Sequence, residues 1–323
     1  MRRGWVFRVV LVAVAAGLAG CGGAPVTSAR AARPVVALPP GVQDPARIPA
    51  AVPAPDCDPR ASLRPPARMP APGRMPAGST MARIAARGYL IAGVDQNKNL
   101  FGFIRDGELA GFDIDFVHAI AAAMLGDPDK VQFRAISSAD RISSLNSGRV
   151  DLVADSMTIT CDRLQQVAMS TDYFDSGQKI MVRRGSPYRS IADLGGAKVC
   201  APTGTTSINT IAGQRPAPIP VAVVDWTDCL VLLQQGYADA ISTTDSVLLG
   251  LVAQDPTTVV RGPRFTDEPH GFAVRRSQPD LIRFVNGVLE RMRADGRWRA
   301  EYVRWLTGLD PVVPAPPAAR YLG

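Results

Sequence analysis

The sequence has little of what metal centres, phosphate sites or membrane spans require. It contains two histidines, and none of its five cysteines is spaced as Cys-x-x-Cys, so no metal site is predicted. The hydroxyl-rich turn at 203–207 lacks the lysine of a nucleotide-binding P-loop. The apolar run at 9–19 is too short to cross a bilayer. We therefore expect no resident metal or cofactor, and no membrane span in that run.

The first 20 residues predict secretion. Three arginines precede the apolar run, which ends in small residues, as in a secretory signal peptide. The sequence Leu-Ala-Gly-Cys at 18–21 resembles the lipobox of bacterial lipoproteins, where cleavage leaves the cysteine as the lipidated first residue. Two or three acyl chains on Cys21 would anchor the protein stably, whereas one chain binds a membrane only marginally. We expect a lipid-anchored protein on the outer face of the cytoplasmic membrane; an ordinary signal peptide with a chance cysteine is the alternative.

Residues 21–78 are dominated by alanine, proline and arginine, and they hold 14 of the 28 prolines. This composition, with little hydrophobic periodicity, predicts an extended and mostly disordered tether. The formal net charge of +7 belongs to this end of the chain, because the first 78 residues carry ten of the 36 basic and three of the 29 acidic residues. The remaining 26 basic and 26 acidic residues balance, so nucleic-acid binding by the folded part is not predicted.

Four cysteines remain once Cys21 is assigned to lipid. An even number in an exported chain predicts two disulfides, for which three pairings are possible in principle. Cys200 and Cys229 are close in sequence, so we pair them, which leaves Cys57 with Cys161.

From residue 90 onward, short apolar strands alternate with helical patterns, which is typical of an α/β fold with mostly parallel sheets. The roughly 245 residues after the tether are many for one such sheet, so two lobes are expected. Near the C-terminus, six apolar residues recur at helical spacing and should face the core. They are Leu281, Phe284, Val285, Val288, Leu289 and Met292.

The stretch DLVADSMTITCDRLQQVAMSTDYF at 151–174 carries the most informative pattern. Its first residues alternate like a half-buried strand, and Thr160 stands where a helix N-cap is expected, which puts Arg163 at the third helical position. A cation there faces the positive end of the helix dipole and is disfavoured by roughly 0.3–1 kcal/mol. A bound anion would offset this cost, since Ser156 and Thr158 add donors beside the guanidinium. A surface arginine in a loop is the alternative.

Several motifs, in order, resemble those of the bacterial extracellular solute-binding proteins of family 3, which bind polar amino acids for ABC importers. The resemblance covers roughly residues 78–309. Besides the stretch at 151–174, it rests on GVDQNKNLFGF at 93–103, GFDIDFVHAIA at 111–121, SADRISSLNSGRVDL at 138–152, STTDSVLLG at 242–250, DEPHGFAV at 267–274 and DGRWRAEYVRWL at 295–306. With CDPRASLRP at 57–65, the chain also looks like the actinobacterial glutamate- or glutamine-binding lipoproteins.

This resemblance implies a two-lobed α/β fold of the periplasmic-binding-protein type II class, with a cleft between lobes that two hinge strands join. Mapped here, lobe 1 is 79–176 plus 271–309, lobe 2 with the hinges is 177–270, and 310–323 form a Pro/Ala-rich tail. Ligand binding would stabilise the closed state, because only then do both lobes contact the ligand. We expect a monomer.

A free α-amino acid needs a cation for its carboxylate and an anion for its ammonium. The resemblance implies that Arg163 binds the carboxylate with help from Ser156 and Thr158. It also implies that Asp245 accepts the ammonium; a plain N-cap aspartate is the alternative.

Two further features would shape the cleft. The turn at 203–207 precedes a helix and offers free N–H groups, so Thr205 and Thr206 are expected to touch the ligand. Phe101 is expected to be a hydrophobic wall of the cleft.

Lys98 and Arg141 are the candidates for recognising the ligand side chain. Arg141 stands where the family's glutamate and aspartate binders also carry arginine, and leaving it buried without an anion would cost on the order of several kcal/mol. Glutamate or aspartate is therefore favoured. Asp95 matches an aspartate that contacts the side-chain amide in glutamine binders: paired with Lys98 it would be neutralised, and unpaired it would favour asparagine or glutamine. Ser138 stands where glutamine binders place an aromatic ring, so glutamine specificity is not carried over; for Lys98, a solvated loop lysine is the alternative.

Two functions would share this cleft: delivery of the amino acid to an ABC permease, and sensing by a lipoprotein that docks on a membrane signalling protein. An enzyme on the same fold, as in the cyclohexadienyl dehydratases, is disfavoured. The candidate cleft residues include no pair of free carboxylates and no histidine base, because His118 lies in an apolar helix and His270 near a hinge.

Overall fold

The computed structural model describes residues 41–43, 48, 56–308 and 312–323. The expected signal peptide, the lipidation site Cys21 and the first part of the tether lie outside these residues. Among the helices of the described part, none combines the length and the hydropathy needed to span a bilayer.

The first lobe is built on a five-stranded sheet in the order β6-β2-β7-β16-β8. Strand β2 pairs in parallel with β6 and β7, whereas β16 is antiparallel to β7 and β8. All of β2 is buried, as expected for a strand covered on both faces. The strands are β2 Leu90–Val94, β6 Val131–Ala135, β7 Leu152–Ala154, β8 Val167–Met169 and β16 Ala273–Arg275; a separate three-stranded sheet comprises β3 Asn97–Lys98, β4 Gly102–Arg105 and β5 Glu108–Ala110.

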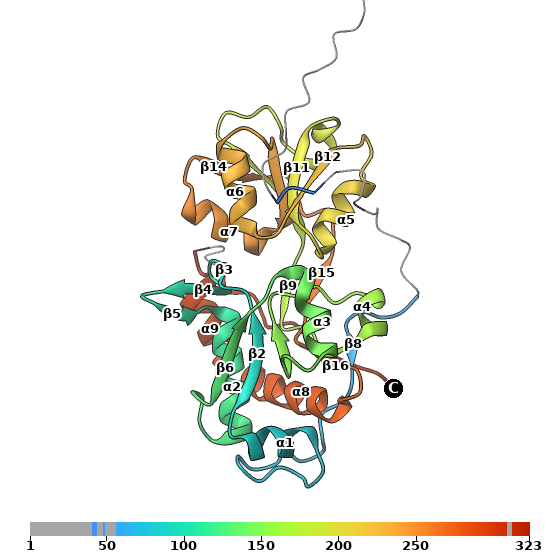
Figure 1. Ribbon diagram of the computed structural model, residues 1–323, viewed down its shortest axis with the longest axis vertical. Coiled ribbons are helices and arrows are strands. Elements are labelled where there is room, and N and C mark those ends of the chain that lie inside the picture. The colour runs from blue at the N-terminus through green and yellow to red at the C-terminus, as the bar shows by residue number, and fades with distance from the viewer. Residues whose placement is uncertain (1–40, 44–47, 49–55, 309–311) are drawn as a thin grey trace, which may run out of the picture. The chain divides into compact units, whose positions relative to one another are not determined.

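The helices of this lobe cover its sheet, with α2 against β2 and α8 against β16 (Figure 1). Proline at the first position of α8 suits a helix start, where its missing N–H costs nothing. The six apolar residues predicted to face the core from this helix are each at most 1% exposed, which confirms that prediction. The helices are α1 Thr80–Arg87, α2 Phe112–Leu125, α3 Arg141–Asn146, α4 Cys161–Gln166, α8 Pro279–Ala294 and α9 Arg297–Leu306, and the 3-10 turn η2 spans Ser138–Asp140.

The second lobe has its own five-stranded sheet, in the order β12-β11-β13-β10-β14. Strand β11 is parallel to β12 and β13, and β10 is antiparallel to β13 and β14. The predicted disulfide Cys200–Cys229 is present and ties β11 to α6 in the core of this lobe. The elements are β10 Gln178–Arg183, β11 Lys198–Pro202, β12 Ile219–Val223, β13 Ala240–Thr244, β14 Thr258–Arg261, α5 Thr206–Gly213, α6 Trp226–Gln234, α7 Asp245–Gln254 and the 3-10 turn η3 Ile191–Leu194.

Two crossover strands join the lobes. Strands β9, Phe174–Ser176, and β15, Glu268–His270, pair with each other in antiparallel register. The two-lobed α/β fold implied by the resemblance is therefore confirmed. Within the described residues, the crossover strands form a two-stranded ribbon of their own and belong to neither five-stranded sheet.

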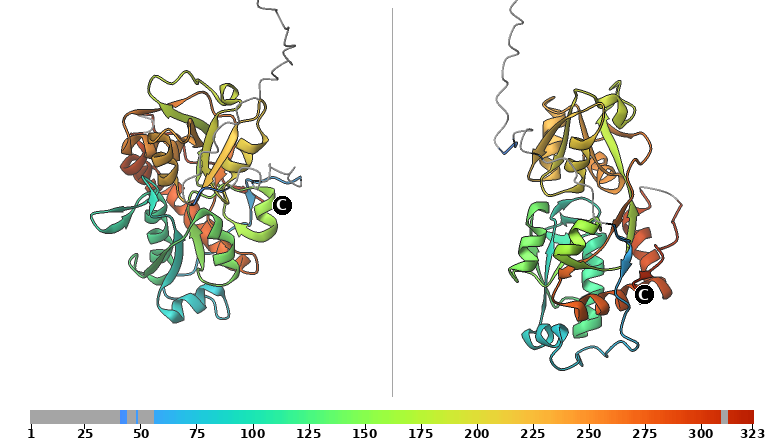
Figure 2. Two further views of the ribbon diagram at one scale, coloured as in Figure 1. Left: turned by 45° about the horizontal axis from the view of Figure 1, so that its top comes forward. Right: turned by 90° about the vertical axis from the view of Figure 1, so that its right-hand side faces the viewer.

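The last part of the expected tether packs on the first lobe. Strand β1, Ala61–Ser62, pairs in parallel with β17, Arg320–Tyr321, so this segment lies beside the C-terminal strand (Figure 2). Met69 packs against the core of this lobe, and Cys57 forms the predicted disulfide with Cys161. The expectation of a disordered tether up to residue 78 is thus corrected for 57–78. Individual long-range contacts order this segment, and they leave no periodic pattern in the sequence.

Candidate functional site

Polar and charged side chains from both lobes surround a small cavity of about 20 Å³. This is room for about one water molecule, so an amino acid could enter only after the surrounding groups move apart. The lining residues are Lys98, Arg141, Ser156, Thr158, Arg163, Thr205, Thr206, Ser207, Trp226, Thr243, Thr244, Val247 and Glu268. Eight of the eleven ligand-binding candidates from the sequence are thus brought near one another or next to the cavity, with Ser138 bonded to Arg141 at its edge.

Arg163 reaches across the cavity from lobe 1 to lobe 2. The Thr160 hydroxyl accepts from its backbone N–H at 3.2 Å, which makes Thr160 the N-cap and puts Arg163 third in α4, as predicted. Its guanidinium donates to the Thr158 carbonyl at 2.7 Å and to the Gly204 carbonyl at 3.1 Å. Burial, and secondarily the charge of Arg141, lower the pKa of Arg163 to about 10, and the Glu268 carboxylate opposes that shift. The guanidinium is therefore a cation at neutral pH that is held largely by neutral carbonyls.

The carboxylate of the cavity belongs to Glu268, on crossover strand β15. It accepts hydrogen bonds from three hydroxyls, those of Thr158 at 2.7 Å, Thr206 at 3.1 Å and Thr266 at 3.0 Å. The residue is only 3% exposed, and no ion pair to it is found within the described residues. A buried carboxylate held by hydroxyls alone retains most of its capacity to attract a cation. Sequence reasoning did not single out Glu268, although it lies in the DEPHGFAV motif.

Asp245 does not line this cavity, so its expected contact with the ligand ammonium stays a prediction. It is the first residue of α7, and its carboxylate accepts from the Ser176 hydroxyl at 2.8 Å and from Arg264 Nε at 2.6 Å. These partners hold it beside a different cavity, and the preceding residue, Thr244, lines the one described above. A helix start turns consecutive side chains in different directions, so a shift of one residue is enough to separate them.

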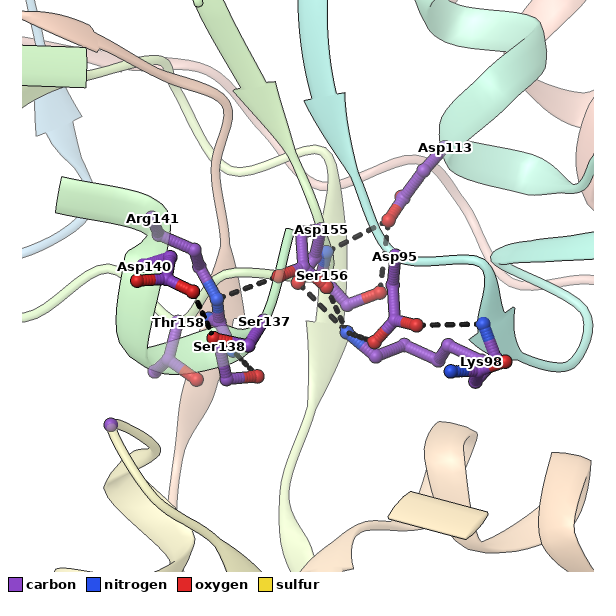
Figure 3. Close-up of polar contacts among 12 residues, drawn as sticks. Asp95, Lys98, Asp113, Ser137, Ser138, Asp140, Arg141, Asp155, Ser156 and Thr158 are labelled. Atoms are coloured by element: carbon purple, nitrogen blue, oxygen red, sulfur yellow. Dashed lines mark hydrogen bonds and ion pairs between the residues drawn. The ribbon is translucent and has the colours of Figure 1, made fainter. Parts of the chain in front are cut away.

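Behind the cavity, Lys98 and Arg141 share one buried aspartate, Asp155 (Figure 3). Arg141 Nε lies 2.7 Å from Asp155 Oδ2, Lys98 Nζ donates to Asp155 Oδ1, and the Asp155 side chain is fully buried. The expectation that Arg141 would be left without an anion is therefore corrected. Asp155 was not recognised as a partner, because the sequence separates it from Lys98 by 57 residues.

Asp95 lies next to this cluster, with Oδ2 3.6 Å from Lys98 Nζ and Oδ1 accepting from the Asn97 N–H at 2.7 Å. Burial raises the pKa of Asp95, and the Lys98 charge opposes that rise. Asp95 is thus paired with Lys98, one of the two alternatives left open by the sequence, and it does not line the cavity itself.

Ser156 and Phe101 have structural surroundings. The Ser156 N–H and hydroxyl donate to Asp113 Oδ2 at 2.8 and 3.0 Å, and Ser156 has a left-handed φ of 43°. That strain lets the strand end turn sharply at the cavity edge. Phe101 is fully buried and contacts Phe112 and Phe174 edge to face, so it belongs to the lobe core and not to a cleft wall. In the sequence, an apolar residue beside polar ones gives the same pattern whether it lies in a lobe core or in a cleft wall.

The turn at 203–207 brings lobe 2 onto lobe 1. The Thr205 hydroxyl caps α5 by accepting from the Ile208 N–H at 3.2 Å. The Thr206 hydroxyl lies 3.5 Å from the Thr158 hydroxyl across the cavity. Gly204 has a φ of +72°, and a Cβ there would lie 2.5 Å from the Ala139 Cα of lobe 1. Only glycine allows both this conformation and this approach of the two backbones.

Comparison with known proteins identifies the family. Residues 90–308 match the model of the bacterial extracellular solute-binding proteins, family 3. The chain belongs to this family. It is 35% identical over 230 residues to the ABC transporter glutamine-binding protein GlnH of Bacillus subtilis (strain 168), covering 70% of this chain and 84% of that protein. It is 32% identical over 222 residues to the glutamate/glutamine/aspartate/asparagine-binding protein BztA of Rhodobacter capsulatus, covering 64% of this chain and 65% of that protein.

Solved structures agree with this family. An ancestral arginine-binding protein bound to glutamine superposes with a TM-score of 0.65 and 35% identity, over 68% of this chain and 98% of that one. The family and these relatives are solute-binding proteins and not enzymes, so this chain is a solute-binding protein.

Proposed function

We propose that this protein captures a polar amino acid outside the cell for an ABC importer. The observation that carries the proposal is that Arg163 and Glu268, a cation and an anion, face one cavity between two lobes. An α-amino acid is a zwitterion whose two charges are one carbon apart, and a site with both signs on opposite sides selects for it. The related glutamine-binding protein of Bacillus subtilis and the glutamate/glutamine/aspartate/asparagine-binding protein of Rhodobacter capsulatus support the same ligand class.

In this proposal Arg163 receives the α-carboxylate and Glu268 receives the ammonium. A guanidinium has five donors, so Arg163 can keep its bonds to protein carbonyls and still bind a carboxylate with the remaining ones. The N-terminus of α5, with Thr205 and Thr206, adds N–H and hydroxyl donors on the side of lobe 2. The ligand ammonium would supply a cationic partner for the buried Glu268 carboxylate, which without ligand is bonded to hydroxyls.

The ligand side chain would face Lys98, Arg141 and Ser138, and we propose that glutamate or aspartate is preferred. Three cations and one carboxylate line the cavity. Asp155 offsets one of them, and Asp95, whose Oδ2 lies 3.6 Å from Lys98 Nζ and does not line the cavity, only partly offsets another. An acidic side chain uses the remaining positive charge, whereas an amide does not. Asparagine and glutamine would bind more weakly, as second ligands.

Binding would close the lobes around the β9–β15 ribbon. Gly204 already contacts lobe 1, and Arg163 already bonds to its carbonyl, so the contacts of the closed state are built into the chain. A closed lobe pair presents a different surface from an open one, which a membrane permease can distinguish. The lipid on Cys21 would hold the protein at the outer face of the cytoplasmic membrane, near that permease.

The test is calorimetric titration of the protein with each of the twenty amino acids. We expect glutamate and aspartate to bind most tightly, with asparagine and glutamine behind them. Tight binding of a basic or aliphatic amino acid, with none of these four, would contradict the specificity. Deletion of the protein should abolish uptake of the ligand; loss of a downstream response with uptake intact would favour the sensor function instead.

A further inference from the structure

Arg60 forms a cluster with three carboxylates at the hinge. Its guanidinium pairs with Asp172 and with Asp175, and its Nη2 lies 2.7 Å from Asp267 Oδ1. Asp172 and Asp175 flank the start of crossover strand β9, and Asp267 immediately precedes crossover strand β15. One side chain therefore holds both strands that connect the lobes. The ligand cavity does not use Arg60, which calls for a separate explanation.

The segment that carries Arg60 is fixed at both of its ends. Cys57 is bonded to Cys161, and Ser62 is in β1, with its hydroxyl donating to the Met169 carbonyl at 2.6 Å. Asn286, fully buried in α8, donates to the Ser62 hydroxyl at 2.9 Å. We call residues 57–63 the hinge strap. It is attached to lobe 1 and reaches the crossover ribbon through Arg60 alone among its ion pairs in the described chain.

The far end of this cluster adjoins the cavity. Successive side chains of a strand point to opposite faces, and Asp267 directly precedes Glu268. Pro269 pairs with Asp175 in the ribbon, so Asp175, Pro269 and Asp267 share the face on which Arg60 lies. The carboxylate of Glu268 points the other way, into the cavity. Asp267 and Glu268 are thus adjacent residues on opposite faces of the ribbon, one paired with Arg60 and the other lining the cavity.

The near end of the strap adjoins the other half of the proposed site. Cys161 is the first residue of α4, and Arg163 is the third. The disulfide therefore attaches the strap to the helical turn that presents the carboxylate-binding guanidinium. The strap is therefore bonded to α4, which carries Arg163, through the disulfide, and to the residue before Glu268 through the Arg60–Asp267 ion pair.

The charges explain why this contact would affect opening and closing. Asp175 and Asp267 lie on or beside opposite strands of the ribbon around one cation, so without Arg60 these two carboxylates would repel one another. Burial raises the pKa of Asp172 to about 8, and the neighbouring Asp175 adds to that rise while Arg60 opposes it. Asp172 is 1% exposed, which makes its ion pair sensitive to loss of the partner.

We propose that the hinge strap is part of the binding apparatus: Arg60 is a positioning residue that aligns Glu268 with Arg163 and favours the closed lobes. This inference rests on the proposed function, since it assigns Arg60 a role in amino-acid affinity. It also assigns a role to the Cys-Asp-Pro-Arg motif at 57–60, which the ligand cavity itself does not explain.

The first experiment compares Arg60→Ala with Arg68→Ala by titration with glutamate, using the full-length protein. Arg68 is an exposed arginine that follows the hinge strap in sequence and has no ion pair within the described residues. We expect Arg60→Ala to weaken affinity at least tenfold, mainly through faster dissociation, because the closed state is destabilised. Arg68→Ala should bind like the unchanged protein. Arg60→Lys should recover only part of the loss, because an ammonium cannot span three carboxylates as a guanidinium does.

Asp267→Asn keeps the inference testable if Arg60→Ala fails to fold. Asp267 is 73% exposed, so its substitution should leave stability unchanged. We expect it to weaken glutamate binding at least threefold, and to add little in the Arg60→Ala background. Unchanged affinity in folded Arg60→Ala, or in Asp267→Asn where Arg60→Ala does not fold, would overturn the proposal.

A measurement without ligand separates this inference from the proposed function. Fluorescent labels on the two lobes report their distance distribution in the absence of any amino acid. Arg60→Ala, and reduction of Cys57–Cys161, should both broaden that distribution, whereas Arg68→Ala should not. If no amino acid binds the unchanged protein, the proposed function fails, and the lobe-distance distribution alone tests the role of the hinge strap. A distribution in Arg60→Ala identical to that of the unchanged protein would overturn the proposal that the strap favours the closed lobes.

Discussion

Exchanging Glu268 for glutamine tests which carboxylate receives the ligand ammonium. The variant keeps the size of the side chain and can still bond to the three threonine hydroxyls, because an amide offers one acceptor and two donors. What it removes is the negative charge at a position that is 3% exposed. The fold should therefore survive, and the effect should fall on the ligand.

The magnitude follows from the burial of the site. An ion pair at 4 Å is worth about 4 kcal/mol at an effective dielectric constant of about 20, a value that also describes buried sites. A neutral amide keeps a hydrogen bond worth about 1 kcal/mol. The expected loss for Glu268→Gln is about 2–3 kcal/mol, or roughly 30- to 150-fold in Kd. Titration calorimetry with glutamate measures it directly, with urea unfolding as the check on stability.

Asp245→Asn is the matched control. Its ion pair with Arg264 is partly exposed, so its loss should cost about 0–1 kcal/mol of unfolding free energy and should leave Kd within about twofold. The opposite result would refute the reasoning. If Asp245→Asn abolished binding and Glu268→Gln did not, the ligand ammonium would bind Asp245 at the start of α7. The geometry of the closed cavity would then differ from that of the ligand complex.

Three further predictions concern closure, pH and stability. Gly204→Ala should weaken glutamate binding at least tenfold, since its Cβ would lie 2.5 Å from Ala139 Cα, and small-angle scattering with saturating ligand should show incomplete closure. Burial already raises the pKa of Asp95, and a ligand side-chain carboxylate nearby should raise it further, so glutamate binding should take up protons and strengthen as pH falls. Calorimetry in buffers of different ionisation enthalpy measures this proton uptake. We expect it for glutamate, and not for glutamine or for the Asp95→Asn variant. Asn286→Ala should lower the unfolding free energy by about 2–4 kcal/mol, because it leaves buried partners unsatisfied; urea unfolding measures this loss, and an unchanged unfolding free energy would contradict the role of Asn286 as a buried anchor.

Local patterns sufficed wherever a feature depends on neighbours in sequence. The N-cap at Thr160 and the apolar periodicity of α8 follow from rules that span a few residues, and both are confirmed. The pairing of Cys200 with Cys229 also followed from proximity along the chain. The two-lobed fold came from the resemblance, which the family match supports over residues 90–308.

Features that depend on distant partners were missed or misplaced. Glu268 gains its surroundings from threonines in three separate segments, so no local motif marks it as a buried anion. Asp155 directly follows strand β7, and its two cations come from elsewhere in the lobe. For Phe101, hydrophobicity alone cannot distinguish a core ring from a cleft wall, because both are buried against apolar neighbours.

The filled state of the cavity has a consequence for affinity. Arg163 is already bonded to carbonyls of both lobes, and Arg141 and Lys98 are already paired with Asp155. A ligand therefore does not supply the first anionic partner of Arg141 or Lys98. The binding free energy it gains is the difference between the interactions of its own carboxylates and those of the carbonyls and the aspartate that contact these cations without ligand. That difference is largest at Arg163, where a full negative charge joins neutral carbonyls, and at Glu268, where a full positive charge joins hydroxyls. Affinity for amino acids in general should thus come from these two residues. Discrimination among side chains should rest on the smaller imbalance between Lys98, Arg141, Asp155 and Asp95, so related acidic and amide ligands should differ in Kd by far less than either differs from a ligand without the α-ammonium.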